Sequence, residues 1–334
     1  MAIPRWQHAL AGAITDAAEL LELLQLPRSL LPAALAAARA FPLRVPRGFV
    51  ARMKKSDPRD PLLLQVLPLG VELNETSGFS SDPVGDMASK AAPGMLHKYS
   101  GRVLLVATGA CGVHCRYCFR RHFPYGDETA SSGHWQSALT AIRGDSSIHE
   151  VILSGGDPLS LSDRRLRELT DALRDIPHVH RLRIHSRQPI VLPERVDASL
   201  LAWLRSIPLQ KVLVLHVNHA NELDDQVREA CRSLRDAGVT LLNQSVLLRD
   251  INDSADALSA LSEALFAAGI LPYYLHLLDR VQGAAHFEVN EACAVALMRE
   301  LLTRLPGYLV PRLVRETPGD ASKTPVPLWG NACC

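Results

Sequence analysis

From residue 102 onward, short apolar runs rich in Val, Ile and Leu alternate with longer amphipathic stretches. The stretch at 161–176, for example, brings Leu166, Leu169 and Leu173 onto one face of a helix. A strand alternating with a helix about every thirty residues is typical of parallel βα units. The apolar runs are RVLLVAT (102–108), HEVILSG (149–155), RLRIHS (181–186), KVLVLHVN (211–218), TLLNQSVLL (240–248) and YYLHLL (273–278). Six units are too few for a closed eight-fold barrel, so the pattern predicts an α/β fold, an open, partial (β/α)6 TIM-like barrel.

The first 95 residues have a different pattern. An Ala/Leu-rich helical stretch is followed by the polar, proline-containing connection LRVPRGFVARMKKSDPRDP at 43–61. The chain is therefore expected to have three parts: an N-terminal helical extension at 1–95, the partial barrel at 96–315 and a C-terminal segment at 316–334. The extension could cap the barrel, mediate a dimer or dock a partner, and the pattern leaves these alternatives open, a homo-oligomer among them.

Composition narrows the class of protein. The chain has 334 residues, 47% hydrophobic and 21% charged, with a formal net charge of +1. No strong overall field favours nucleic acid or an anionic membrane. The leucine-rich stretch at 20–41 contains Glu22, Pro27, Arg28 and Pro32, so it is not expected to span a bilayer. Seven cysteines without a secretory leader indicate a reducing compartment, and a cytoplasmic protein is expected.

Polar residues gather at the C-terminal ends of the predicted strands. In parallel βα folds these ends meet at one mouth, where the active site is built. The residues concerned are the cysteines after the first run, then Gly155, Gly156, Asp157, Arg187, His216, Asn218, Gln244 and Asp279. Within SGGDPL (154–159), the glycines allow the strand end to approach the polar groups of a cofactor.

The loop after the first strand holds three cysteines in a C-x3-C-x2-C spacing: Cys111, Cys115 and Cys118. Three thiolates can bind a [4Fe–4S] cluster and leave one iron without a protein ligand. The alternatives are buried structural cysteines or a zinc site completed by His114 or His122.

Lysine is scarce, which limits the candidates for a covalent cofactor link. Lys54 and Lys55 lie in an exposed basic run, and Lys211 opens a strand at the wrong end of the barrel. Lys323 is the best candidate, followed by Lys98 and Lys90. A lysine amine is what pyridoxal 5′-phosphate (PLP) requires.

Taken together, the motifs resemble the lysine 2,3-aminomutase family of the radical S-adenosylmethionine (AdoMet) superfamily over about residues 82 to 327. LRVPRGF and CRYCFRRHFPY point to the branch that supplies β-lysine for elongation factor P. The motifs that carry the resemblance are HKYSGRVLL, the cysteine loop with FRRHF, SGGDPL, SRQPIVLPERV, HVNHANE, NQSVLLRDIND, YYLHLLDRVQGAAHF and the PG-x3-KTP ending.

The resemblance implies an isomerase that converts L-lysine to β-lysine with a [4Fe–4S] cluster, AdoMet and PLP. AdoMet would occupy the open iron, and a 5′-deoxyadenosyl radical would abstract the β hydrogen of PLP-bound lysine. The implied roles are cluster ligation by Cys111, Cys115 and Cys118; PLP attachment by Lys323; PLP phosphate binding by Arg187 with Lys98 and Arg102; AdoMet contacts by Gly155, Gly156, Asp157, His216 and Gln244; substrate carboxylate binding by Arg120; and ε-ammonium binding by Asp279 and Glu316. An electron donor and a functional link to an elongation factor P β-lysine ligase are implied as well.

The chain departs from the family pattern in three places. Glu316 stands where many relatives carry aspartate, and GDAS replaces a glycine run before Lys323. Ser254 occupies a position that is a zinc-binding cysteine in larger members, whose other zinc ligands lie in a C-terminal tail; here the tail ends at Cys333 and Cys334. No zinc site of the family type is expected. Cys231 and Cys293 are expected to be plain buried thiols on helices.

Two other functions remain open from the sequence. The same radical chemistry could act on another amino acid or on a lysine of a protein. An iron–sulfur sensor or structural protein without turnover is the alternative from a different class.

Overall fold

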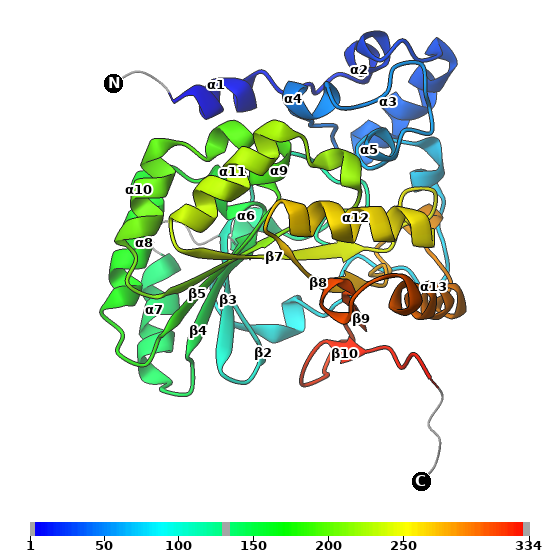
Figure 1. Ribbon diagram of the computed structural model, residues 1–334. Helices are drawn as coiled ribbons and strands as arrows, with labels where there is room; N and C mark the ends of the chain where they lie inside the picture. The colour runs from blue at the N-terminus through cyan, green and yellow to red at the C-terminus, as the bar shows by residue number, and fades with distance from the viewer. Residues whose placement is uncertain (1–3, 129–133, 330–334) are drawn as a thin grey trace.

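The computed structural model describes residues 4–128 and 134–329. Ten strands form one curved sheet whose spatial order follows the chain from β1 to β10 (Figure 1). β3 to β9 are parallel, whereas β1, β2 and β10 join the edges in antiparallel pairs. The strands are β1 (Lys90–Ala92), β2 (Met95–Tyr99), β3 (Arg102–Thr108), β4 (Glu150–Gly155), β5 (Arg181–Ser186), β6 (Gln210–Leu215), β7 (Val239–Val246), β8 (Leu271–His276), β9 (Arg312–Arg315) and β10 (Thr324–Pro325).

The predicted open, partial (β/α)6 barrel is confirmed. The six apolar runs form β3 to β8, and the described strands do not close into a ring. A seventh parallel strand, β9, was not predicted, because its four residues include two arginines and form no apolar run. The predicted boundary at residue 95 falls inside β2, which pairs with β3 as part of the sheet.

Helices cover the outer face of the sheet (Figure 1). Five of them begin where a side chain accepts a hydrogen bond from a free backbone N–H: α8 at Ser162, α10 at Asp197, α11 at Asp224, α12 at Ser254 and α13 at Asn290. The helices are α1 (Arg5–Ala11), α2 (Ala17–Leu23), α3 (Leu31–Ala40), α4 (Arg47–Val50), α5 (Pro61–Leu64), α6 (Tyr125–Glu128), α7 (His134–Gly144), α8 (Asp163–Arg174), α9 (Gln188–Val191), α10 (Ala198–Ser206), α11 (Asp225–Asp236), α12 (Ala255–Ala267) and α13 (Glu291–Arg304). No described helix has the length and apolar character needed to cross a membrane.

The main core lies between the sheet and these helices, and strand alternation determines which side chains enter it. On β3, Val103 and Leu105 are buried in this core, whereas Arg102 and Leu104 point into the barrel. Burial of a leucine side chain contributes roughly 1.5–3 kcal/mol, so packing accounts for most of the stability of the helices. The polar residues of the parallel strands are left to line the interior.

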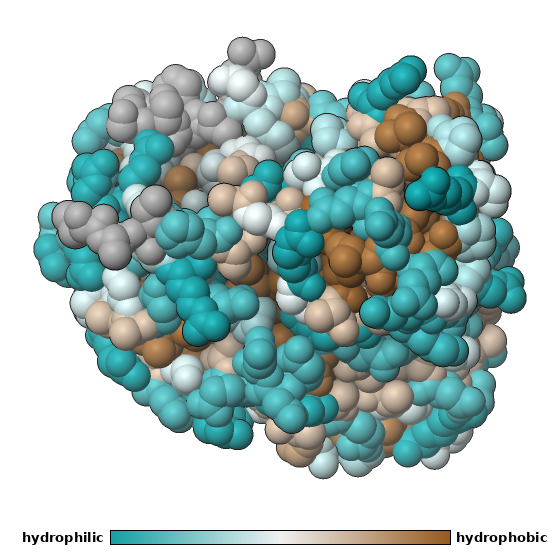
Figure 2. Space-filling model, turned by 90° about the horizontal axis from the view of Figure 1, so that it is seen from above, coloured by the Kyte–Doolittle hydropathy of each residue, from teal (hydrophilic) through white to brown (hydrophobic). Residues whose placement is uncertain are grey.

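The N-terminal helices α1 to α5 form a separate layer at the C-terminal ends of the strands. Leu20, Phe49 and Leu62 belong to a second core that also contains Val113 of the cysteine loop and Val191 of α9. Figure 2 views the molecule from above, onto this layer, and shows brown apolar surface on the side where Figure 1 draws α2, α3 and α5. The extension therefore packs directly against the loop that carries the cysteines.

Candidate active site

One cavity of about 480 Å³ opens at the C-terminal ends of the strands, and every predicted site residue lines it. The residues come from β2 to β5, from β7 and β8, and from the segments that follow the strands, which are far apart in the sequence. The predicted residues on its wall are Lys98, Arg102, Cys111, Cys115, Cys118, Arg120, Gly155, Gly156, Asp157, Arg187, His216, Gln244, Asp279, Glu316 and Lys323.

The cysteine loop follows β3 and is held by backbone hydrogen bonds to the extension. The N–H of His114 donates to the carbonyl of Arg44 at 2.9 Å, and that of Arg116 donates to the carbonyl of Gln65 at 2.9 Å. Cys111, Cys115 and Cys118 are each half-buried on the cavity wall. Burial raises the pKa of the Cys118 thiol to about 11, and the nearby Cys115 adds to the effect.

A buried glutamate ties the same loop to the extension. Glu72 pairs with Arg116 at 2.6 Å and with Arg121 at 2.8 Å, and all three side chains are almost inaccessible to solvent. A buried carboxylate between two guanidiniums is fully paired, which offsets the cost of removing it from water. The spacing of the three thiols therefore depends on contacts made by residues outside the loop.

SGGD, at the end of β4, packs against the backbone of the cysteine loop. A Cβ atom on Gly156 would lie 2.5 Å from the carbonyl oxygen of Ala110, so only glycine allows this approach. The carboxylate of Asp157 accepts hydrogen bonds from the backbone of Leu159, Arg187 and Gln188 and from the Ser186 hydroxyl, and burial raises its pKa. These contacts join β3, β4 and β5 at the mouth, and the predicted AdoMet contacts of the motif stay a prediction.

A continuous series of ion pairs crosses the cavity wall. Arg120 contacts Asp86 at 2.6 Å, and Asp86 contacts Lys98 at 2.7 Å. Lys98 also contacts Glu316 at 2.8 Å, and Glu316 contacts Lys323 at 2.6 Å. Burial by itself would lower the pKa of Arg120, but the Asp86 carboxylate holds that pKa above its usual value. The predicted substrate residues Arg120 and Glu316 are thus linked through Asp86 and Lys98.

The two acids predicted to bind an ammonium differ in their electrostatics. Burial would raise the pKa of Glu316, but Lys323 and Lys98 lower it to about 2. Burial raises the pKa of Asp279 to about 7, although Lys323 opposes the change. Glu316 is consequently charged at neutral pH, whereas Asp279 titrates there.

Three imidazoles line the inside of the barrel: His185 on β5, His216 directly after β6, and His276 on β8. Gln244 lies 3.1 Å from His216, and burial lowers the pKa of His216 to about 3, so this imidazole is neutral. His185 and His276 also line the cavity, and the Nε2 atom of each is buried without a hydrogen-bond partner among the described residues. Such atoms are suited to a bound polar group.

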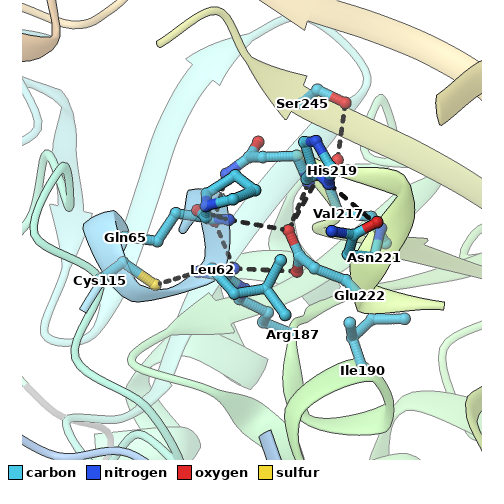
Figure 3. Close-up of polar contacts among 12 residues, drawn as sticks. Leu62, Gln65, Cys115, Arg187, Ile190, Val217, His219, Asn221, Glu222 and Ser245 are labelled. Carbon is cyan, nitrogen blue, oxygen red and sulfur yellow. Dashed lines mark hydrogen bonds and ion pairs between the residues drawn. The ribbon is translucent and has the colours of Figure 1, made fainter. Parts of the chain in front are cut away.

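The two arginines predicted at the PLP phosphate have different surroundings. Arg102 lies over the ring of Tyr99, 4.8 Å from its centroid, and makes no ion pair within the described part of the chain. Arg187 pairs with Glu222 at 2.9 Å and lies 2.8 Å from the sulfur of Cys115 (Figure 3). Its phosphate role stays a prediction, because its guanidinium contacts the cysteine loop, Gln65 and Glu222.

Sequence reasoning missed Asp86, His185 and His276. His185 and His276 interrupt apolar strands at the inward-facing positions, which is a signal that alternation provides. Asp86 lies in a polar connection without periodicity, so only its contacts identify it.

The sequence of the chain is similar to those of several L-lysine 2,3-aminomutases over nearly its whole length. It is 52% identical to an L-lysine 2,3-aminomutase of Escherichia coli (strain K12) over 324 residues, which is 97% of this chain and 94% of that protein. It is 47% identical to the L-lysine 2,3-aminomutase of Haemophilus influenzae over 96% of this chain and 94% of that protein. The chain belongs to the L-lysine 2,3-aminomutase family.

As a member of the L-lysine 2,3-aminomutase family, the chain is an enzyme of the isomerase class. It is also 33% identical to the L-lysine 2,3-aminomutase of Clostridium subterminale over 96% of this chain and 77% of that protein. No family model matches. A radical SAM methyltransferase from Sphaerobacter thermophilus gives a TM-score of 0.48 at 15% identity over 66% of this chain and 68% of that chain, a likeness too low to bear on function.

The cavity of this L-lysine 2,3-aminomutase family member carries groups of the kinds that two of the expected cofactors require. Three thiols on one loop suit an iron–sulfur cluster, the Lys323 amine is the group that PLP requires, and Arg102, which has no ion pair among the described residues, suits a phosphate. The imidazoles weighed as zinc ligands bond to backbone carbonyls, His114 to Pro42 at 2.9 Å and His122 to Gln282 at 3.2 Å. Across the described ranges, no three His, Cys, Asp or Glu side chains converge on a point where a single metal ion could bind.

The remaining cysteine predictions have mixed outcomes. Cys231 is buried on α11, as expected. Cys293 is exposed on α13, so its prediction as a buried thiol is wrong, because it faces solvent in the first turn of that helix. Ser254 is the N-cap of α12. Cys333 and Cys334 lie outside the described residues.

Proposed function

We propose that this protein converts L-lysine to β-lysine, using a [4Fe–4S] cluster, AdoMet and PLP held in the one cavity. The observation that carries the proposal is the shared wall: the three cysteines, Lys323 and the acids Asp279 and Glu316 all line the same space. Migration of an amino group requires its reacting groups to be held within a few ångströms of one another. When bound, the cluster and AdoMet supply radical chemistry and PLP supplies an electron-accepting ring.

Lys323 would hold PLP through its side-chain amine, with Arg102 at the phosphate. In the described structure the ammonium of Lys323 is paired with Glu316 at 2.6 Å. Engagement of Lys323 elsewhere would remove one cation from a buried carboxylate, which is costly unless another cation replaces it. The ε-ammonium of lysine is a cation of the same type, so Glu316 would exchange one ammonium for another.

Asp279 and Arg120 would complete the recognition of lysine. Asp279 lies on the cavity wall in the loop after β8, and the charges of Lys323 and Glu316 influence its carboxylate. Arg120, already oriented by Asp86, would bind the substrate carboxylate through its planar fork. A side chain of another length or charge would leave one of these buried groups unpaired, which supports lysine over other amino acids.

Further proposals concern the use of the product in the cell, the electron donor, the location and the assembly of the protein. LRVPRGF and CRYCFRRHFPY support the elongation factor P branch, in which β-lysine passes to a ligase that modifies that factor. The proposal also includes an electron donor that reduces the cluster and a location in the cytoplasm. Assembly into a homo-oligomer stays an open alternative.

The test is anaerobic reconstitution with iron, sulfide, PLP and AdoMet, followed by incubation with labelled L-lysine and no protein acceptor. The expected product is free β-lysine, identified by chiral chromatography. Conversion of a different amino acid in preference to lysine would replace the substrate in this proposal. Absence of both product and 5′-deoxyadenosine from cluster-loaded, reduced protein would contradict an enzymatic role for the cluster.

A further inference from the structure

Arg187 is a buried guanidinium that donates to four side chains of the described residues near the cysteines. Its side chain is 6% exposed, and its backbone N–H donates to Asp157 at 2.9 Å. The guanidinium donates to Gln65 at 2.6 Å, to Tyr117 at 2.6 Å and to Glu222 at 2.9 Å. These contacts come from separate parts of the chain, so the position of the charge is strongly constrained (Figure 3).

The same guanidinium reaches one of the predicted cluster ligands. Its Nη1 atom donates to the sulfur of Cys115 at 2.8 Å (Figure 3). The rings of Phe49 and Tyr117 lie 5.5 Å and 5.7 Å from the guanidinium carbon. Aromatic surroundings exclude water and strengthen the interaction between a fixed charge and a nearby group.

We propose that Arg187 sets the reduction potential of the iron–sulfur cluster through its hydrogen bond to Cys115; this inference rests on the cluster of the proposed function. Hydrogen bonds to cluster sulfurs and nearby charge are the means by which proteins tune such potentials. One-electron reduction adds a negative charge to the cluster and neither forms nor breaks a bond. A cation beside a ligand sulfur stabilises the reduced form more than the oxidised form, so it raises the potential.

Glu222 limits the size of this effect and provides a test of its sign. Its carboxylate accepts from Arg187, from Gln65 at 3.1 Å and from the backbone of Asn218 at 2.9 Å. Glu222 is fully buried, so it partly neutralises the guanidinium at short range. Arg187 thus acts through Cys115 as a positioning residue, with Glu222 as the counter-charge.

The experiment is a redox titration of the reconstituted full chain with dithionite, followed by electron paramagnetic resonance before AdoMet is added. Arg187→Gln is expected to lower the midpoint potential and Glu222→Gln to raise it, with iron content unchanged. Arg187→Gln leaves Glu222 without its cation, which can prevent folding. The double variant Arg187→Gln/Glu222→Gln removes both charges and is expected to give a potential between those of the single variants.

Arg102→Gln is the matched control, because it removes a cavity arginine that does not contact Cys115. It is expected to weaken PLP binding, measured by absorbance, and to leave the midpoint potential unchanged. Arg187 variants that hold a full cluster at the wild-type potential would overturn the inference. If those variants also bind PLP more weakly, the role of Arg187 would be to bind the PLP phosphate. Wild-type protein that assembles no cluster would instead reject the proposed function.

Discussion

The ammonium of Lys323 lies 2.6 Å from the carboxylate of Glu316, and both side chains are largely buried. The residue expected to hold PLP and the residue expected to hold the substrate therefore form one ion pair. Lys98 contacts the other oxygen of Glu316 at 2.8 Å, so this carboxylate stays paired when Lys323 is engaged elsewhere. If the two residues have their proposed roles, PLP attachment and lysine binding are coupled through Glu316.

Lys323→Ala is expected to abolish PLP absorbance and β-lysine formation while iron content stays unchanged, because the cysteine loop does not depend on this side chain. Absorbance spectra and iron analysis of the reconstituted variant provide the measurement. Lys211→Ala is the control, since Lys211 caps Ile207 at the opposite end of the barrel. Full aminomutase activity in Lys323→Ala would remove Lys323 from its proposed role.

The affinity for lysine is expected to rise as pH increases from 6 to 8. Asp279 has a pKa of about 7, so its carboxylate is neutral below that pH and charged above it. An ε-ammonium pairs only with the charged form, and KM for lysine should fall through this range. Asp279→Asn should remove this pH dependence along with most of the activity. A KM that is flat between pH 6 and pH 8 in the wild type would count against Asp279 as a substrate contact.

The charged carboxylate of Asp279, which is expected to bind the substrate, should also lower the stability of the ligand-free protein. A pKa raised from 3.8 to about 7 in the folded state means that the stability contribution of Asp279 is present below pH 4 and is lost as pH rises toward 7. Asp279→Asn should therefore stabilise the ligand-free protein by about 1–3 kcal/mol at pH 8, a figure reduced for partial exposure, and change little at pH 4. Urea unfolding at both pH values measures the difference, and a variant less stable at pH 8 would oppose this account.

Asp86→Asn should weaken substrate binding more than turnover. Its carboxylate orients Arg120 and also holds Lys98, so its loss leaves two buried cations less well paired. We expect KM for lysine to increase at least about tenfold, together with a loss of about 3 kcal/mol in the free energy of unfolding. Glu75→Gln, an exposed change in the same segment, is the control. An unchanged KM in Asp86→Asn would mean that Arg120 is positioned by other contacts.

Gly156→Ala should impair cluster assembly without removing a ligand. The added methyl group would meet the Ala110 carbonyl at 2.5 Å and backbone atoms of Gly109 at 2.8 Å, so the cysteine loop must shift. Iron per chain after reconstitution should fall markedly. Gly144→Ala, where a Cβ meets nothing within 4 Å, should leave the iron content at the wild-type value. Equal iron loading in the two variants would show that the loop tolerates the displacement.

Local pattern was sufficient to predict the barrel. Alternation on β3 to β8 depends on residues two positions apart, and it directs apolar side chains such as Leu105 to the helices and polar ones such as His185 to the interior. Parallel strands bring their C-terminal ends together, so the grouping of Cys111, Gln244 and Asp279 around one mouth followed from their places at or just after the ends of strands.

The sequence by itself determined the order of β3 to β8, the mouth at their C-terminal ends and the predicted site residues that line it, because these follow from periodicity and from the direction of each strand. Only the tertiary structure decided the partners: Arg120 with Asp86, Lys98 with Glu316, and Arg187 with Cys115 and Glu222. These pairs join segments from 34 to 218 positions apart. A buried charge pairs with whichever opposite charge the packing brings within a few ångströms, and no local pattern specifies that choice.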